Sequence, residues 1–224
     1  MSVKLSQLEK VRCELVSWQD IERWTKDVAL KVKASGYRPD VIVGLARGGL
    51  VPARLLSDYL LIKDLYAVKT EHWGITATPD GRARLTQTLG ADVKGRKVLL
   101  VDDITDTGQS LRLAYEHVSS LGPEEVRTAT MLHISHSKFV PDYYSVLVPA
   151  EQWTWFIFPW NLYEDLRNLI SRALKVAHTI KDIKAVMRES FYIDVKASLI
   201  KEVLLDLEER GIARRRGNRW ELAR

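Results

Sequence analysis

Carboxylate, hydroxyl and glycine residues are concentrated in one short stretch of the sequence, between positions 102 and 110. Asp102 and Asp103 directly follow the uncharged apolar run 98–101, and Asp106 precedes the small, hydroxyl-bearing segment 107–110. Backbone N–H groups at the start of a helix bind phosphate well, because they lack internal partners and carry partial positive charge. Nearby carboxylates can accept hydrogen bonds from sugar hydroxyls or hold a divalent cation. The stretch therefore predicts a site for a ligand with a phosphate, a ribose diol and Mg2+; the plainer alternative is a turn in which Asp106 caps a helix.

A second candidate anion site follows another apolar run, residues 41–45. Arg47 offers a planar fork of N–H donors that matches a phosphate, and Gly48 and Gly49 leave the backbone free to approach an anion. This pattern is a weak signal by itself, and it gains weight only beside the carboxylate stretch.

Buried strands and amphipathic helices must position these loops. Uncharged apolar runs are typical of strands that are covered on both faces, and apolar residues at helical spacing mark the helices between them. The expected strands are 41–45, 65–68, 98–101, 126–134 and 143–148, and the expected helices cover about 21–36, 50–60 and 111–121. This alternation predicts an α/β fold with a parallel sheet.

The stretch from Asp102 to Ser110 closely resembles the phosphoribosyl-diphosphate (PRPP) binding motif of the type I phosphoribosyltransferases. Arg47-Gly48 resembles the pyrophosphate loop of the same family and occupies the position where a cis peptide is often found. The resemblance implies the family's fold, a doubly wound parallel sheet with a hood. It implies that Asp102 and Asp103 face the ribose hydroxyls and Mg2+, with Asp103 as the metal ligand, directly or through water. The implied PRPP-binding residues are Arg47, Gly48, Asp102, Asp103, Thr105, Asp106, Thr107, Gly108, Gln109 and Ser110.

The resemblance also implies the chemistry. A member of this family transfers the 5-phosphoribosyl group of PRPP to a purine base with Mg2+ as cofactor, and releases diphosphate and a nucleoside 5′-monophosphate. Asp106 would be the catalytic residue that manages the proton of the purine N7. Gln109 stands where the family usually has Gly, Lys or Arg, and Ser110 stands where it usually has Thr. Both departures leave a phosphate loop possible.

Lys138 and the segment 155–160, part of the aromatic run 153–160, resemble the base-binding segments of the 6-oxopurine phosphoribosyltransferases, and the bacterial xanthine–guanine enzymes most closely. Lys138 would donate to the purine O6, while Trp155, with Phe156 beside it, would stack on the ring. An ammonium group can donate to an oxo group but is repelled by the amino group of adenine. Ile157 stands where the bacterial enzymes have an acid, so guanine, hypoxanthine and xanthine all remain open. The plainer interpretation of the aromatic run is core packing.

Two excursions are expected within a phosphoribosyltransferase domain of residues 1–170. The turn signal Pro79-Asp80-Gly81 lies between the β-prone segments 73–78 and 82–88, which predicts a mobile hairpin over about 70–92. The resemblance implies that this hairpin closes over the reacting centre and excludes water. It also implies a purine hood over about 135–162.

Residues 171–224 carry the whole excess of positive charge. The chain has 34 basic and 29 acidic residues, and this segment contains 13 and 8 of them. Apolar spacing predicts helices over about 180–187 and 195–209, and Gly217-Asn218 predicts a hairpin turn. The pattern indicates a small, basic, winged-helix-like domain. DNA binding is possible for such a domain, but its apolar helices favour a packing or dimerisation role.

These expectations define one principal interpretation and two rivals. The principal one is a purine salvage enzyme that acts on PRPP and a 6-oxopurine as a homodimer or tetramer. The first rival is a transcriptional regulator that senses PRPP or a nucleotide and binds DNA through its C-terminal domain. The second rival is an enzyme for another acceptor, such as adenine or a pyrimidine, and Lys138 argues against adenine. Cys13 is the single cysteine, and the sequence shows neither a membrane span nor a signal peptide, so a cytoplasmic protein is expected.

Overall fold

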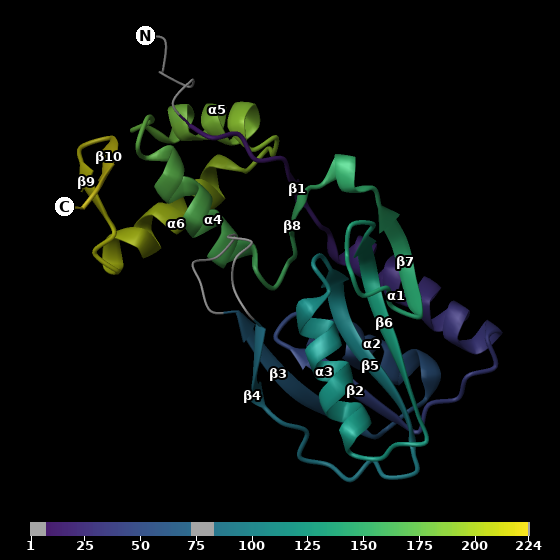
Figure 1. Ribbon diagram of the computed structural model, residues 1–224. Helices are drawn as coiled ribbons and strands as arrows, with labels where there is room; N and C mark the ends of the chain where they lie inside the picture. The colour runs from purple at the N-terminus through teal and green to yellow at the C-terminus, as the bar shows by residue number, and fades with distance from the viewer. Residues whose placement is uncertain (1–7, 73–82, 224) are drawn as a thin grey trace. The chain divides into compact units, whose positions relative to one another are not determined.

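The computed structural model describes residues 8–72 and 83–223, which form two compact units (Figure 1). One unit comprises Trp18–Trp153, and the other combines Met1–Ser17 with Thr154–Arg224. Each unit has a hydrophobic core of its own.

The unit Trp18–Trp153 is built on a six-stranded sheet with the strand order β4-β3-β2-β5-β6-β7. All neighbouring strands run parallel except β4, which is antiparallel to β3 at the edge. The strands are β2 (Val41–Ala46), β3 (Leu65–His72), β4 (Ala83–Gln87), β5 (Lys97–Thr105), β6 (Glu125–Ile134) and β7 (Tyr143–Val148). The sheet confirms the predicted α/β fold.

Helices cover both faces of this sheet. Alternate residues of the central strands point to opposite sides, so Ile42 and Leu99 join the core under α1 (Trp18–Ala34) and α2 (Leu50–Leu60). Val41 and Val98 face the other way, into the core under α3 (Gln109–Ser120). Because both faces are covered, these strands carry apolar side chains at successive positions. None of the helices in the described ranges is long and apolar enough to cross a membrane.

The predicted hairpin is described only at its base. β3 extends to His72, beyond the predicted end at residue 68, and its last residues pair antiparallel with β4. The register places Thr70 opposite Leu85 and Glu71 opposite Arg84. The expected arm 73–78 and the turn Pro79-Asp80-Gly81 lie outside the described residues.

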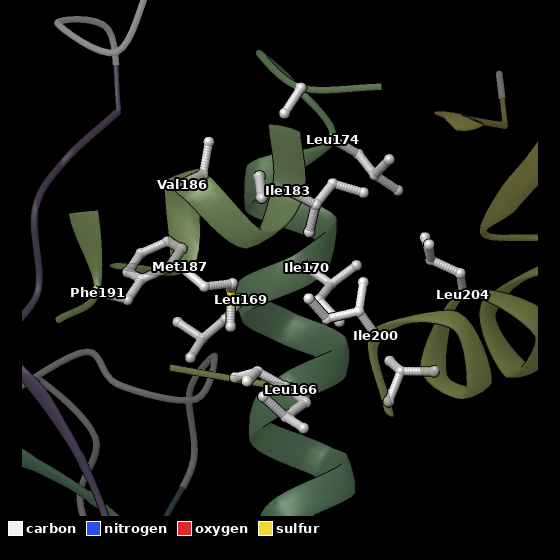
Figure 2. Close-up of a cluster of buried hydrophobic side chains, with 14 of the residues drawn as sticks. Leu166, Leu169, Ile170, Leu174, Ile183, Val186, Met187, Phe191, Ile200 and Leu204 are labelled. Atoms are coloured by element: carbon white, nitrogen blue, oxygen red, sulfur yellow. The ribbon is translucent and has the colours of Figure 1, made fainter. Parts of the chain in front are cut away.

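The second unit joins the N-terminal segment to the C-terminal helices. β1 (Cys13–Leu15) pairs in parallel with β8 (Trp155–Ile157), and both strands pack with α4 (Leu162–Ala173), α5 (Ile180–Ser190) and α6 (Ala197–Glu209). Figure 2 shows the shared core, in which Leu166, Met187 and Ile200 are fully buried. The hairpin of β9 (Ala213–Arg216) and β10 (Arg219–Leu222) follows α6, in the order that the sequence predicts.

The boundary between the units differs from the expected one between residues 170 and 171. That position lies inside α4, whose buried side chains Leu169, Ile170 and Ala173 contribute to one core with α5 and α6. Ile157 of β8 belongs to the same core. A division within α4 would therefore cut through a continuous hydrophobic cluster, and the compact unit instead begins at Thr154.

Two adjacent leucines in α6 test this core. Leu204 is completely buried, whereas 40% of Leu205 is exposed. Leu204→Ala should lower the free energy of unfolding by about 2–5 kcal/mol, since it removes buried methyl groups and leaves a cavity. Leu205→Ala should change it by less than about 0.5 kcal/mol. Urea unfolding followed by circular dichroism measures both values, and equal losses would contradict the described packing.

Candidate active site

The candidate site lies where the connections of the sheet change direction. The chain leaves β2 for β3 on one side, while the chain that leaves β5 reaches β6 on the other side. β2 and β5 are paired neighbours, with Val41 opposite Val98 and Gly44 opposite Val101. Ligands of open α/β sheets bind in the crevice at the carboxyl ends of such strands. The loops after β2, β5 and β6 are therefore the expected binding loops.

Gly48 brings the first two loops into contact. A Cβ atom at Gly48 would lie 1.8 Å from Oδ2 of Asp103, and one at Gly49 would lie 2.4 Å from the carbonyl oxygen of Val101. Neither position can accept a side chain without displacing its neighbour. The cis peptide bond is between Ala46 and Arg47, one bond before the position that the sequence suggested.

The two adjacent carboxylates are held by the backbone that follows them. Asp102 Oδ1 accepts a hydrogen bond from the N–H of Asp103 at 2.9 Å, and Asp103 Oδ1 accepts one from Ile104 at 2.8 Å. Burial, followed by the charge of Asp103, raises the pKa of Asp102 well above its ordinary value. A cation or a pair of sugar hydroxyls would relieve this repulsion, which makes the pair a suitable receptor for either.

The adjacent carboxylates supply one or two of the oxygen ligands that a divalent cation requires. Within residues 8–72 and 83–223 there is no cluster of three or more His, Cys, Asp or Glu side chains that could bind a metal ion. Mg2+ commonly binds through one or two carboxylates together with substrate phosphates and water. Asp103 and a bound diphosphate together fit that pattern.

The loop after β5 presents the start of α3. Gly108 has a φ of 80°, and a Cβ there would lie 2.6 Å from Ser137 Oγ and 2.7 Å from Phe139 Cβ. Glycine is therefore required both by the backbone conformation and by the loop that packs against it. Thr107 Oγ1 accepts a hydrogen bond from the N–H of Gln109 at 3.4 Å, which orders the first turn of the helix.

The loop after β6 carries Lys138 next to this turn. The N–H of Lys138 donates to the carbonyl oxygen of Thr107 at 3.4 Å, and the lysine side chain is exposed. The structure therefore brings together the Arg47 loop, the carboxylates, the segment 106–110 and Lys138 within one unit.

Thr105 has a different environment from the other predicted PRPP-binding residues. Its side chain is buried at the end of β5, where Oγ1 lies 3.3 Å from both Thr130 Oγ1 and His133 Nδ1. The hydroxyl is committed to the interior of the sheet, so only the backbone of Thr105 remains for the predicted ligand contact.

Trp155 and Phe156 of β8 belong to one compact unit, whereas Lys138 belongs to the unit Trp18–Trp153. Trp155 Nε1 donates to Asp165 Oδ1 at 3.0 Å, and both Trp155 and Phe156 are half-buried in β8. Asp165 is 7% exposed, and burial raises its pKa to about 6. Burial, followed by the charge of Asp165, raises the pKa of Cys13 to about 11, so this thiol stays protonated. These contacts give the aromatic segment a packing role in its own unit.

His136 is a site residue to which the sequence patterns assign no role. Its Nε2 atom lies 2.7 Å from Oδ1 of Asp106, and the two side chains are 40% and 43% exposed. The contact joins the loops after β5 and β6, which are 30 residues apart in sequence. The sequence gives only an indirect signal for this role of His136. His136 is two positions before Lys138, and the loops that carry His136 and Asp106 follow the neighbouring strands β6 and β5.

Comparisons with known proteins agree with this geometry. The model of the family described as "Phosphoribosyl transferase domain" matches residues 13–166. The xanthine-guanine phosphoribosyltransferase of Cereibacter sphaeroides is 32% identical over 155 residues, which cover 66% of this chain and 86% of the relative. The hypoxanthine-guanine enzyme of Aquifex aeolicus is 26% identical, with coverage of 69% and 89%. The crystal structure of a purine phosphoribosyltransferase from Pyrococcus horikoshii superposes with a TM-score of 0.57 at 32% identity, covering 67% and 94% of the two chains. The chain therefore belongs to the phosphoribosyltransferase family.

Proposed function

We propose that this protein transfers the 5-phosphoribosyl group of PRPP to a 6-oxopurine base, and that the products are a nucleoside 5′-monophosphate and diphosphate. The main support is the convergence of three loops at the carboxyl ends of β2, β5 and β6. There, Gly48 approaches the Asp103 carboxylate, and the N–H of Lys138 donates a hydrogen bond to the carbonyl oxygen of Thr107. The relatives named xanthine-guanine and hypoxanthine-guanine phosphoribosyltransferases support a purine acceptor.

PRPP would lie across the loops after β2 and β5. The first turn of α3 and the hydroxyls of Thr107 and Ser110 would bind the 5′-phosphate, since unpaired N–H groups at a helix start attract anions. Asp102 and Asp103 would accept hydrogen bonds from the ribose hydroxyls. Arg47 and the amides that follow it would bind the departing diphosphate and stabilise its charge.

Mg2+ fits the carboxylates of this site. Asp103 would hold the ion, directly or through water, and the remaining ligands would come from the diphosphate and ribose oxygens. When bound, the ion would neutralise charge that develops on the leaving diphosphate. The carboxylates are already fixed by backbone N–H groups, so little reorganisation would accompany binding.

The acceptor base would be placed by Lys138 and handled by Asp106. Lys138 would donate to the O6 oxygen, and Trp155 with Phe156 would contact the ring. The N–H of Lys138 donates a hydrogen bond to the carbonyl oxygen of Thr107, the residue after Asp106. The Asp106 carboxylate is therefore close to the loop that carries Lys138. It would accept the proton that the purine loses as the new bond forms. Guanine, hypoxanthine and xanthine, which differ in the substituent at C2, are all candidate acceptors.

The C-terminal helices would support the hood as a packing element. Arg214 and Arg216 both pair with Glu221, at 2.6 and 2.8 Å, so part of the basic charge of the hairpin is compensated. The exposed face of α6 includes Glu202 and Glu208, which would repel a phosphate backbone. These contacts favour packing over DNA binding. A homodimer or tetramer is the expected assembly, and the buried free thiol of Cys13 suits the reducing cytoplasm.

A nucleobase panel tests the proposed reaction. With PRPP and Mg2+, the protein should convert at least one 6-oxopurine into its nucleotide and leave adenine unreacted. Lys138→Ala should raise the KM for the 6-oxopurine about ten- to a hundredfold, the effect of losing a charged hydrogen bond. The affinity for PRPP without base should not change. Conversion of adenine alone would exclude the proposal, and equal weakening for both substrates would place Lys138 in the PRPP site.

Gly48 tests the binding of PRPP. Gly48→Ala should weaken PRPP binding by at least about tenfold. The new methyl group must displace the Asp103 carboxylate and so disturb the contacts proposed between this carboxylate and PRPP with Mg2+. Gly90→Ala is the matched control, since a Cβ there would have no atom within 4 Å. Calorimetric titration with PRPP and Mg2+ measures both affinities, and circular dichroism checks the fold. Equal affinities in the two variants would mean that Asp103 does not contribute to PRPP binding.

Asp106 tests the handling of the proton. Asp106→Asn should lower kcat by about 10²–10⁴-fold, because the amide cannot accept a proton but keeps the shape of the turn. The Kd of PRPP should stay close to that of the wild type. Asp40→Asn serves as the control, because Asp40 is an exposed residue before β2 whose Oδ2 accepts from Lys97 N. A near-wild-type kcat for Asp106→Asn would remove Asp106 from the mechanism.

A further inference from the structure

The contact between His136 and Asp106 is not needed for the shape of either loop. The loop after β6 is already fixed by backbone bonds from Ser135 to Val148 and from Ser137 to Ile134, both at 2.9 Å. The N–H of Ala150 also donates to Ser135 Oγ at 2.9 Å. The imidazole of His136 is therefore free to serve a purpose other than holding its own loop.

Asp106 is also not used as a helix cap. The N-cap of α3 is Gly108, which makes no side-chain capping bond, and Thr107 accepts the N–H of Gln109. The carboxylate of Asp106 reaches instead to His136 Nε2 at 2.7 Å. Both side chains are partly exposed, so the pair faces solvent on the side of the sheet where the binding loops meet.

We infer that His136 is a positioning residue for Asp106: because an ionised carboxylate can only accept, Nε2–H of His136 donates to Oδ1 of Asp106 and holds this side chain in one orientation. This inference rests on the proposed function and adds a positioning residue to it. The hydrogen bond engages Oδ1 and leaves Oδ2 of Asp106 for the proton of the purine. A carboxylate on a short turn would otherwise sample several rotamers, and misplacement by about 1 Å can cost a hundredfold in rate.

The proton balance of the transfer is simple. As the purine nitrogen attacks C1 of the ribose, an N–H bond of the base breaks and its electron pair stays on the purine. The proton forms an O–H bond on Oδ2 of Asp106, while Nε2–H of His136 keeps its hydrogen bond to Oδ1. That O–H bond later breaks as the proton passes to water at the partly exposed Asp106 side chain, which restores the carboxylate.

Substitution of His136 tests the positioning role. His136→Gln keeps a hydrogen-bond donor for Asp106 and should retain most of kcat. His136→Ala removes the donor and should lower kcat about ten- to a hundredfold, with an unchanged KM for PRPP. His117→Gln, on α3, is the control that should keep the wild-type kcat.

The difference between the two His136 variants carries the test. An equal loss of kcat in His136→Gln and His136→Ala would overturn the inference while leaving phosphoribosyl transfer in place. A wild-type kcat in His136→Ala would overturn it equally. Absence of transfer to every base would instead refute the proposed function.

A measurement without turnover tests the contact itself. In the free protein, the ring-nitrogen chemical shifts of His136 should change in Asp106→Asn, whereas those of His117 should not. Unchanged shifts for His136 would show that the two side chains do not interact in solution, and the inference would fail whatever the activity.

Discussion

The close approach of Gly48 to the Asp103 carboxylate is the constraint on which the candidate site depends. Backbone and carboxylate can meet only because no side chain stands between them, since a Cβ would lie 1.8 Å from Oδ2. The approach in turn requires β2 and β5 to be neighbours in register, with Val43 opposite Leu100. That pairing is stabilised by apolar side chains buried on both faces of the sheet. The hydrophobic core thus sets the separation of two loops that carry opposite charges.

A second glycine contact extends the same arrangement to the loop after β6. Ser137 and Phe139 pack against the backbone of Gly108, and the N–H of Lys138 donates a hydrogen bond to the carbonyl oxygen of Thr107. Three loops are consequently fixed mainly through backbone contacts and glycines. Their charged side chains, such as Arg47 and Lys138, remain exposed at the edge of the sheet. A site organised in this way needs little rearrangement when an anionic ligand binds.

The features of the fold and the site that could be predicted from sequence are those formed by residues that are consecutive in the chain. The strand 98–101 and the carboxylates after it are adjacent in the chain, so apolar pattern and side-chain chemistry suffice to identify them. The contact of His136 with Asp106 joins residues 30 positions apart, and no local pattern marks it. The unit boundary escaped prediction for a similar reason. The apolar face of α4 looks the same in sequence whether it packs on the sheet or on α5 and α6.

The aromatic segment 155–157 shares its core with the C-terminal helices, so these helices have a structural role in its unit. Trp155 is held by Asp165 of α4, and Ile157 lies in one cluster with residues of α5 and α6. Asp165 has a raised pKa, so the buried group that orients the indole costs free energy when it is ionised. The surrounding helices must offset that cost through packing. The segment 155–157 is thus stabilised by the helices of its own unit, and this packing accounts for the apolar positions of α5 and α6.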